Sequence, residues 1–281
     1  MAIKVLIDSA SDINQKEAQE LGLILLPMNI SFGDKEYLDG VDLLPSEFYT
    51  LLANSQHNPT TSLINSYRFA EAFEKYTANG DQVIVITMSS KLSGTYQAAV
   101  QASLDYPDKV FVVDSLNACT GERILGLYAL ELIKKGLSAT EIVQELNSAK
   151  TRIRVIALVD TLEYLKRGGR ISSAAAFAGK LLALKPIISV IDGEVKMISK
   201  AMGFKNTCNL LNKLIEEKGG VNTDKPFGLI WSGNSTANLD AFIKNNPQIS
   251  KINNPNKFVL GGTIGTHVGP GAVGVAFFEK E

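Results

Sequence analysis

The scarcest reactive side chains of this 281-residue chain are two histidines, His57 and His267, and two cysteines. Two cysteines are too few for a cysteine-rich zinc site or a disulfide framework, so we expect no metal site. Any step that needs an imidazole must use one of the two histidines. His267 is the better candidate, because five glycines surround it between residues 261 and 271 and predict a permissive loop, where the backbone can approach a ligand closely. A structural role for His267 stays open.

Two hydroxyl-rich segments supply neutral hydrogen-bond donors. They read Pro-Thr-Thr-Ser at 59–62 and Ser-Ser-Lys-Leu-Ser-Gly-Thr-Tyr at 89–96. The second follows a predicted strand and precedes a predicted helix, so Ser93 and Gly94 lie where free N–H groups and the helix dipole favour an anion. Ser93 could equally be an ordinary helix N-cap, and the first segment a plain turn.

A third segment is basic. Residues 161–172 predict a short helix that ends at Gly168 and Gly169, with Lys166, Arg167 and Arg170 near its end. These cations could complement the helix dipole in solvent, or they could contact an acidic partner.

The sequence motifs of dinucleotide binding, nucleotide hydrolysis and serine hydrolysis are absent or lack their required context. Residues 269–274 match G-x-G-x-x-G, but an apolar run and the last residue Glu281 follow where a dinucleotide site needs a helix and an acidic residue. The sequence has neither a P-loop nor a G-x-S-x-G motif. With 28 Lys and Arg against 29 Asp and Glu, the charge does not favour nucleic acid or a strong attraction to anionic lipid.

The location of the protein is expected to be cytoplasmic. The first apolar run contains Lys4 and ends at Asp8, which is unlike the apolar core of a signal peptide. The longest apolar segments are also shorter than the roughly 20 residues that span a bilayer. We therefore expect no transmembrane segment and at most a transient membrane contact.

The elements that must position these residues alternate in the first half of the chain. Short apolar runs bounded by turn residues are typical of buried parallel strands, and the amphipathic runs between them are typical of helices. The expected strands are Ile3–Ile7, Leu23–Ile30, Val83–Met88 and Val110–Val113, and the expected helices are Asn14–Leu21, Ser46–Leu52, Tyr67–Tyr76, Thr95–Leu104 and Thr120–Lys134. This pattern predicts an α/β domain with a mostly parallel sheet.

One pattern recurs where predicted strands end. An aspartate and a hydroxyl residue follow an apolar run at Asp8, Asp114 and Asp160. Such residues cap the next helix, and they also gather at the carboxyl edge of a sheet, where open α/β folds bind ligands.

The second half of the chain has a different pattern of expected strands and helices. Its expected strands are Val155–Val159, Pro186–Ile191, Val195–Ile198, Phe227–Trp231, Lys257–Leu260 and Val273–Phe278, and its expected helices are Ala174–Leu184, Thr207–Glu217 and Ala237–Lys244. Asp192-Gly193 predicts a hairpin and hence antiparallel pairing. We therefore predict two domains, an N-terminal α/β domain at residues 1–152 and a C-terminal α+β domain with a largely antiparallel sheet at residues 153–281.

Taken together, the motifs resemble the DegV family of bacterial fatty-acid-binding proteins. The resemblance rests on five segments in one order: Asp8-Ser-Ala-Ser-Asp12, Pro59-Thr-Thr-Ser62, Ser89-Ser-Lys-Leu-Ser-Gly-Thr-Tyr96, Leu162-Glu-Tyr-Leu-Lys-Arg-Gly-Gly-Arg-Ile-Ser172 and Gly265-Thr-His-Val-Gly-Pro-Gly271. Each segment is weak alone, but five in order from the first strand to the last are specific.

The resemblance implies a non-catalytic protein that encloses one long-chain fatty acid between its two domains and needs no other cofactor. Some members are the acyl-carrying subunit of a fatty acid kinase, in which a separate ATP-binding subunit phosphorylates the carboxylate. By motif position, carboxylate binding falls to five residues, which are Thr61, Ser62, Ser93, Gly94 and His267.

Two positions depart from the family pattern. Ser62 leads into Leu63-Ile64 where relatives often continue with Gln-Pro, and Met202 stands where some relatives have an arginine near the carboxylate. Neutral donors would then carry more of the binding. Two other functions share the same residues: a hydrolase with Ser93 as nucleophile and His267 as base, and a regulatory protein whose partner recognises the lipid-loaded form.

Overall fold

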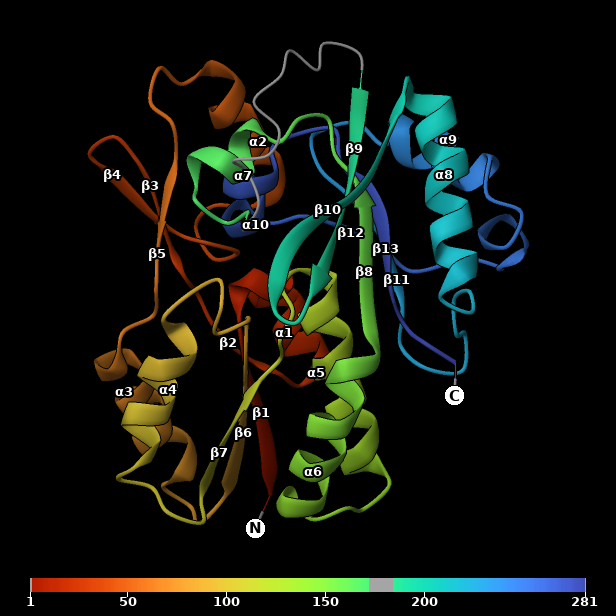
Figure 1. The fold of residues 1–281 in the computed structure, drawn as a ribbon. Helices are drawn as coiled ribbons and strands as arrows, with labels where there is room; N and C mark the ends of the chain where they lie inside the picture. The colour runs from red at the N-terminus through yellow and green to blue at the C-terminus, as the bar shows by residue number, and fades with distance from the viewer. Residues whose placement is uncertain (1, 172–183, 281) are drawn as a thin grey trace.

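The computed structural model describes residues 2–171 and 184–280. Two halves lie one above the other, each built on its own sheet (Figure 1). The lower half is an α/β unit with a parallel sheet, and the upper half is built on a mixed, mostly antiparallel sheet. The predicted fold class is therefore confirmed.

The parallel sheet of the lower half has the strand order β2-β1-β6-β7. Its strands are β1 (Ile3–Asp8), β2 (Ile24–Leu26), β6 (Gln82–Thr87) and β7 (Val110–Asp114). The helices of this half are α1 (Gln15–Leu21), α3 (Ser66–Thr77), α4 (Thr95–Ser103), α5 (Thr120–Lys134) and α6 (Ala139–Ala149). Helices α3 and α4 lie on one side of this sheet and α5 and α6 on the other (Figure 1). Four consecutive residues of β6, 83–86, are fully buried, as a strand covered on both faces requires.

The upper sheet has the strand order β10-β9-β8-β13-β11-β12. Its strands are β8 (Ile153–Leu158), β9 (Leu184–Ile191), β10 (Glu194–Met202), β11 (Gly228–Trp231), β12 (Lys257–Val259) and β13 (Val273–Phe278). The pair β11 and β12 is parallel, and the other neighbours are antiparallel. The predicted hairpin turn joins β9 to β10, and Asp192 and Gly193 adopt φ values of 54° and 82°, as a two-residue turn of this kind requires.

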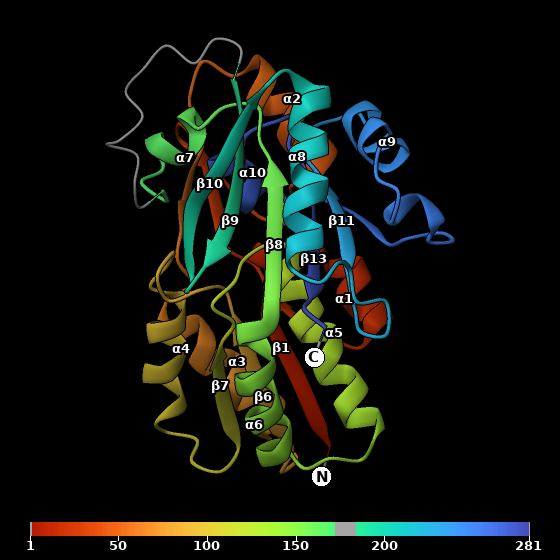
Figure 2. The ribbon, with the colours of Figure 1, turned by 45° about the vertical axis from the view of Figure 1, so that its right-hand side comes forward.

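Different helices cover the two faces of the upper sheet. Helices α8 (Phe204–Glu217) and α9 (Ala237–Lys244) pack on one face, and the short helices α7 (Glu163–Arg167) and α10 (Gly262–Val268) lie at the other (Figure 2). Successive side chains of β8 lie on opposite faces of the sheet. Ile156 packs with the core beneath α8, and Ala157 packs with the side chains around α7 and α10.

Two sequence predictions were wrong in this region. Residues 23–30 do not form one strand, since the chain breaks at Pro27 into β2 of the parallel sheet and β3 (Asn29–Phe32) of a separate sheet. The glycine-rich segment around His267 is not an open loop, because residues 262–268 form α10. The separate sheet has the order β4-β3-β5, and it consists of β3, β4 (Lys35–Leu38) and β5 (Thr60–Ser62), with α2 (Pro45–Asn54) beside it.

This three-stranded sheet connects the two halves. Strands β3 and β5 and helix α2 all contact α10, although more than 200 residues of chain separate them. We keep the division into residues 1–152 and 153–281 as a proposal, with β8 beginning at Ile153. The expected helix Ala174–Leu184 lies outside the described residues, except for Leu184, which begins β9.

Candidate functional site

A cavity of about 380 Å³ lies where α10, β5, the segment after α7 and the loops of the lower half meet. All five residues that the sequence assigned to carboxylate binding line this cavity, namely Thr61, Ser62, Ser93, Gly94 and His267. Arg170 also lines it, and the rest of the wall is largely apolar. Segments that are far apart in the sequence therefore bring one cation and several neutral polar groups to one place.

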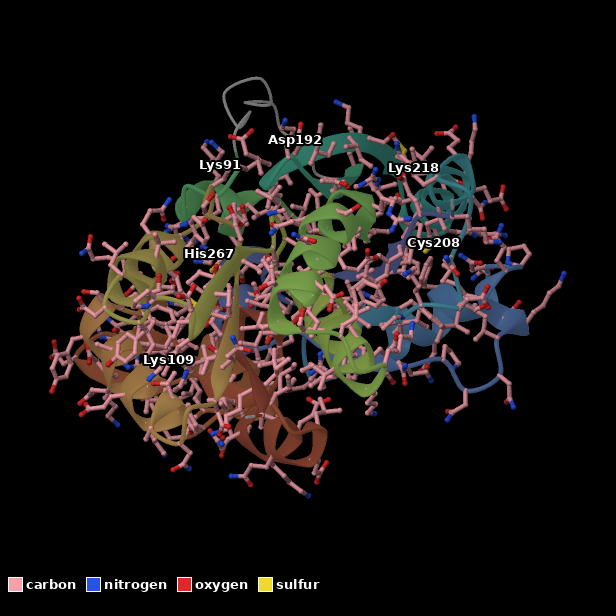
Figure 3. All side chains as sticks on the ribbon, turned by 90° about the horizontal axis from the view of Figure 1, so that it is seen from below. Lys91, Lys109, Asp192, Cys208, Lys218 and His267 are labelled. Carbon is pink, nitrogen blue, oxygen red and sulfur yellow. The ribbon has the colours of Figure 1, made fainter. Side chains whose placement is uncertain are left out.

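His267 meets Thr61 at the polar end of the cavity. The Thr61 Oγ1 atom, on β5, lies 2.9 Å from Nε2 of His267, on α10, and the two hydrogen-bond. The other ring nitrogen, Nδ1, is buried against Gly168, where an added Cβ would lie only 2.0 Å away. Glycine at position 168 thus leaves room for the imidazole. In the view from below, His267 lies on the opposite side of the upper sheet from Cys208 of α8 (Figure 3).

The imidazole of His267 is held in its neutral form. Burial, as the larger cause, and the positive charge of Arg170 together lower the pKa of His267 to about 4. At neutral pH the ring is therefore a neutral hydrogen-bonding group and a weak base.

Ser93 is placed by the turn that begins α4. Gly94 is the N-cap residue, so Ser93 precedes the cap and is not the N-cap itself. The Ser93 hydroxyl lies 2.9 Å from Oγ1 of Thr95 and accepts a hydrogen bond of 3.3 Å from the Thr95 backbone N–H. Its partner is thus Thr95 and not His267, which does not favour a Ser93–His267 hydrolase.

Two of the recurring aspartates hold the loop that carries Ser93. Strands β1 and β7 flank β6, and their terminal residues are Asp8 and Asp114. Asp8 accepts from the backbone N–H of Met88 at 2.8 Å, and Asp114 accepts from Ser90 at 3.2 Å. Asp8 also accepts from Ala10 at 2.9 Å, so the capping interpretation is confirmed there. The two carboxylates fasten the loop from both neighbouring strands.

The hairpin between β9 and β10 also contacts the loop that carries Ser93. The Ser89 hydroxyl donates a 2.7 Å hydrogen bond to the carbonyl of Gly193 at the hairpin turn. Lys91 and Asp192 accordingly lie along the same edge of the molecule (Figure 3).

Arg170 reaches the cavity because the chain reverses after α7. Gly169 adopts a φ of +66°, and the guanidinium of Arg170 then donates to the carbonyls of Leu92 at 3.3 Å and Gly168 at 2.5 Å. Lys166 and Arg167 remain exposed on α7, where Arg167 hydrogen-bonds Asn58. The Gly-Gly pair before Arg170 was the sequence signal for this separation of the three cations.

Met202 does not take part in the cavity wall. Its side chain is 65% exposed at the end of β10. Arg170, which the sequence grouped with a possible partner surface, is the cation that lines the cavity.

A second, smaller cavity of about 60 Å³ adjoins the first. It shares Ala118, Ile264 and Val268 with the first cavity and extends among aliphatic side chains of β8 and β9, including Ile188. The Cys119 thiol also lies there, and burial raises its pKa well above the ordinary value. The combined space has a polar end at His267 and an apolar end against the upper sheet.

The described part of the chain contains no helix that is long and apolar enough to cross a membrane. Across residues 2–171 and 184–280, no three His, Cys, Asp or Glu side chains are grouped so that they could hold a metal ion.

Comparison with known proteins identifies close relatives over the whole chain. The model of an uncharacterised protein family called DegV matches residues 2–280. A DegV domain-containing protein of Caldanaerobacter subterraneus is 36% identical over 282 residues, which cover 99% of each chain. One of Clostridium perfringens is 35% identical over 97% of this chain and 96% of the relative.

Solved structures agree over the same length. A DegV family protein from Thermus thermophilus, described with fatty acid binding, has a TM-score of 0.87 at 31% identity and 100% coverage of both chains. DegV of Bacillus subtilis, described as a fatty acid binding protein, has a TM-score of 0.84 at 29% identity, also with full coverage. A stearic-acid-binding protein from Eubacterium ventriosum has a TM-score of 0.86 at 25% identity, with 100% and 99% coverage.

Proposed function

The chain belongs to the DegV family, and we propose that it binds one long-chain fatty acid in the two adjoining cavities, with the carboxylate at the polar end. One observation carries this proposal: a polar end, where Thr61 contacts His267 and Arg170 lines the wall, adjoins an aliphatic space against the upper sheet. The solved relatives described as fatty acid binding proteins support it.

The polar end suits a carboxylate for two reasons. Neutral hydroxyl and imidazole groups, and the backbone at the start of α4, provide donors, while Arg170 provides one positive charge. Hydrogen bonds to a charged group contribute about 1.5–3 kcal/mol each, which mainly offsets the lost hydration of the carboxylate. The head group therefore contributes orientation more than affinity.

The apolar walls of the two adjoining cavities supply the affinity. Burying roughly fifteen methylene groups at about 0.8 kcal/mol each gives about 12 kcal/mol before association costs, which remove several kcal/mol. A tail that runs through both cavities would contact both halves of the chain at once.

We also propose that the bound carboxylate is presented to a separate ATP-dependent kinase subunit, as the family resemblance implies. The exposed side chains of Lys166 and Arg167, on α7 beside the cavity, are the proposed contacts with an acidic surface of that partner. The test is acyl phosphate formation by a purified kinase subunit with the wild-type chain and with a Lys166→Glu, Arg167→Glu variant. Loss of transfer with unchanged fatty acid binding would support the contact, and unchanged transfer would contradict it.

Organic extraction of the purified protein, followed by mass spectrometry, tests the binding function. We expect about one fatty acid per chain, and weaker binding of added palmitate by Thr61→Val, Ser93→Ala and His267→Gln. Ser103→Ala is the matched control, because its hydroxyl bonds the carbonyl of Val100 away from the cavity. A lipid-free extract together with no binding of added palmitate would rule the function out.

The alternative is a hydrolase that uses Ser93 and His267. It predicts turnover of ester substrates that Ser93→Ala abolishes. The Thr95 partner of Ser93 and the low pKa of His267 favour the binding function.

A further inference from the structure

Two buried carboxylates hold the start of the helix that carries His267. Asp39 accepts from the backbone N–H groups of Gly262 at 3.0 Å and Thr263 at 3.2 Å, and Asp12 accepts from Gly261 at 2.8 Å. Asp39 is 2% exposed and Asp12 is 9% exposed. Both come from the first forty residues of the chain, so the N-terminal part of the chain satisfies the free donors of a helix that belongs to its C-terminal part.

The body of α10 is held as closely as its start. A Cβ at Gly262 would lie 2.5 Å from Ile30, and a Cβ at Gly265 would lie 2.5 Å from Phe48. The helix therefore lies directly on the small core of β3 and α2, and the glycines allow this approach. The Tyr49 hydroxyl adds a 3.1 Å hydrogen bond to the carbonyl of Leu260 just before the helix.

His267 depends on this support because α10 is short. The helix has seven residues, too few to be stable alone, and His267 is its sixth. A rotation or shift at Gly262 and Thr263 would carry the imidazole away from Thr61. No polar partner on α10 itself holds Nδ1, so the ring position follows from the position of the helix.

We propose that Asp39, assisted by Asp12, is a positioning residue that fixes α10 so that His267 meets Thr61 at the polar end of the cavity. The role in ligand binding rests on the proposed function, whereas the placement of His267 is a property of the free chain. Asp39 acts through the helix and does not itself line the cavity.

Histidine NMR on the full chain tests the placement directly. The chain has two histidines, so His267 gives one of two imidazole signals and His57 is an internal reference. In Asp39→Ala we expect the pKa of His267 to rise from about 4 toward 6.5, because a displaced ring regains water and moves away from Arg170. In Asp39→Asn the pKa of His267 should stay much closer to the wild-type value of about 4, because the amide oxygen can still accept from the N–H of Gly262.

A matched control separates placement from general stability. Asp81 accepts from the N–H of Ala2 and pairs with Lys4 at the far end of the lower half, so Asp81→Ala removes a comparable anchor without touching α10. We expect it to leave the His267 titration unchanged. A folded Asp39→Ala protein whose His267 still titrates near 4 would overturn the proposal.

Fatty acid binding provides a separate measurement. We expect Asp39→Ala to weaken palmitate binding at least about tenfold, the effect of losing one good hydrogen bond to a charged group, and Asp39→Asn to weaken it less. If the His267 titration shifted but the palmitate affinity stayed unchanged, the role of Asp39 in ligand binding would be contradicted, and its role in placing His267 would stand. If Asp39→Ala does not fold, Asp39→Ser is measured by the same titration, because a serine side chain is too short to accept from both Gly262 and Thr263. A His267 pKa that stays near 4 in Asp39→Ser would refute the positioning role.

Discussion

Arg170 is the cation at the polar end of the cavity, and its replacement should separate head-group recognition from burial of the tail. We consider Arg170→Gln, which keeps a polar side chain but removes the charge. The variant loses the hydrogen bonds to the carbonyls of Leu92 and Gly168 as well as any contact with the ligand. The loss of those two contacts would change the binding of every ligand. A lower affinity for a single fatty acid would therefore not show that Arg170 contacts the carboxylate.

The size of the ligand-specific effect follows from the chemistry of the pair. A hydrogen bond from a guanidinium to a carboxylate in a partly enclosed site contributes about 1.5–3 kcal/mol, which corresponds to roughly 10- to 150-fold in Kd. Arg170 lies partly buried in the wall, so solvent screens the charge less than at the surface.

Two ligands with the same tail isolate that effect. Calorimetric or fluorescence-displacement titration with decanoate and decanol measures the acid and its uncharged counterpart on the same protein. We expect Arg170→Gln to weaken decanoate by the full factor and decanol by much less. The same variant should raise the pKa of His267, because the charge of Arg170 contributes to its low value.

Arg167→Gln is the matched control for this experiment. Arg167 belongs to the same segment but is exposed and bonds Asn58 outside the cavity, so both ligands should bind as they do to the wild type. If Arg170→Gln weakened decanoate and decanol equally, Arg170 would have only a structural role, and a carboxylate contact there would be refuted.

Three further results are expected. Gly168→Ala should displace His267 and weaken palmitate binding, because the new Cβ would overlap the imidazole. Gly136→Ala is the control: its φ of +81° makes alanine strained and lowers stability, but no atom lies within 4 Å of the new Cβ and the residue is outside the cavity, so the affinity should stay nearly unchanged. Equal binding by both variants would contradict the fit around the imidazole. Ile188→Phe should shorten the apolar cavity and weaken the binding of palmitate more than that of decanoate. In a displacement assay we expect a loss of about fourfold in affinity for each displaced methylene. An equal loss for both acids would argue against a tail at this position. Burial raises the pKa of Asp8 to about 7 from 3.8, so the folded chain binds this proton more tightly than the unfolded chain. Urea unfolding should therefore show a free energy of unfolding that falls by roughly 3 kcal/mol between pH 4 and 7 from this group. An unchanged pH slope in Asp8→Asn would contradict this assignment.

The sequence was sufficient for the elements whose pattern is local. The buried run of β6 and the Asp192-Gly193 hairpin follow from apolar periodicity and turn chemistry alone. Ser93 and Gly94 were identified from their place after a strand and before a helix. These features need no knowledge of distant contacts. Thr61 and Ser62, by contrast, were assigned only by the family resemblance, because their segment alone predicts a plain turn.

Long-range packing decided what the sequence did not reveal. Helix α10 contains two glycines among seven residues, which local propensity disfavours, and it forms because Gly262 and Gly265 pack against β3 and α2. A possible signal was the spacing of glycines at 261, 265 and 269, which places small residues on one face of a helix. The role of Asp39 had no local signal, because its partners lie more than 220 residues away.

The polar end of the cavity combines groups that suit holding a carboxylate better than cleaving a bond. A general base is most effective when its pKa lies near the working pH, whereas His267 titrates near 4 and faces Thr61. The Ser93 hydroxyl already pairs with Thr95, and Arg170 adds a charge that would oppose protonation of the imidazole. A neutral imidazole beside a fixed guanidinium can instead orient an ionised head group by hydrogen bonding, with no proton transfer. The oxygens of a bound carboxylate would then remain nucleophilic, which a partner enzyme that transfers a phosphoryl group requires.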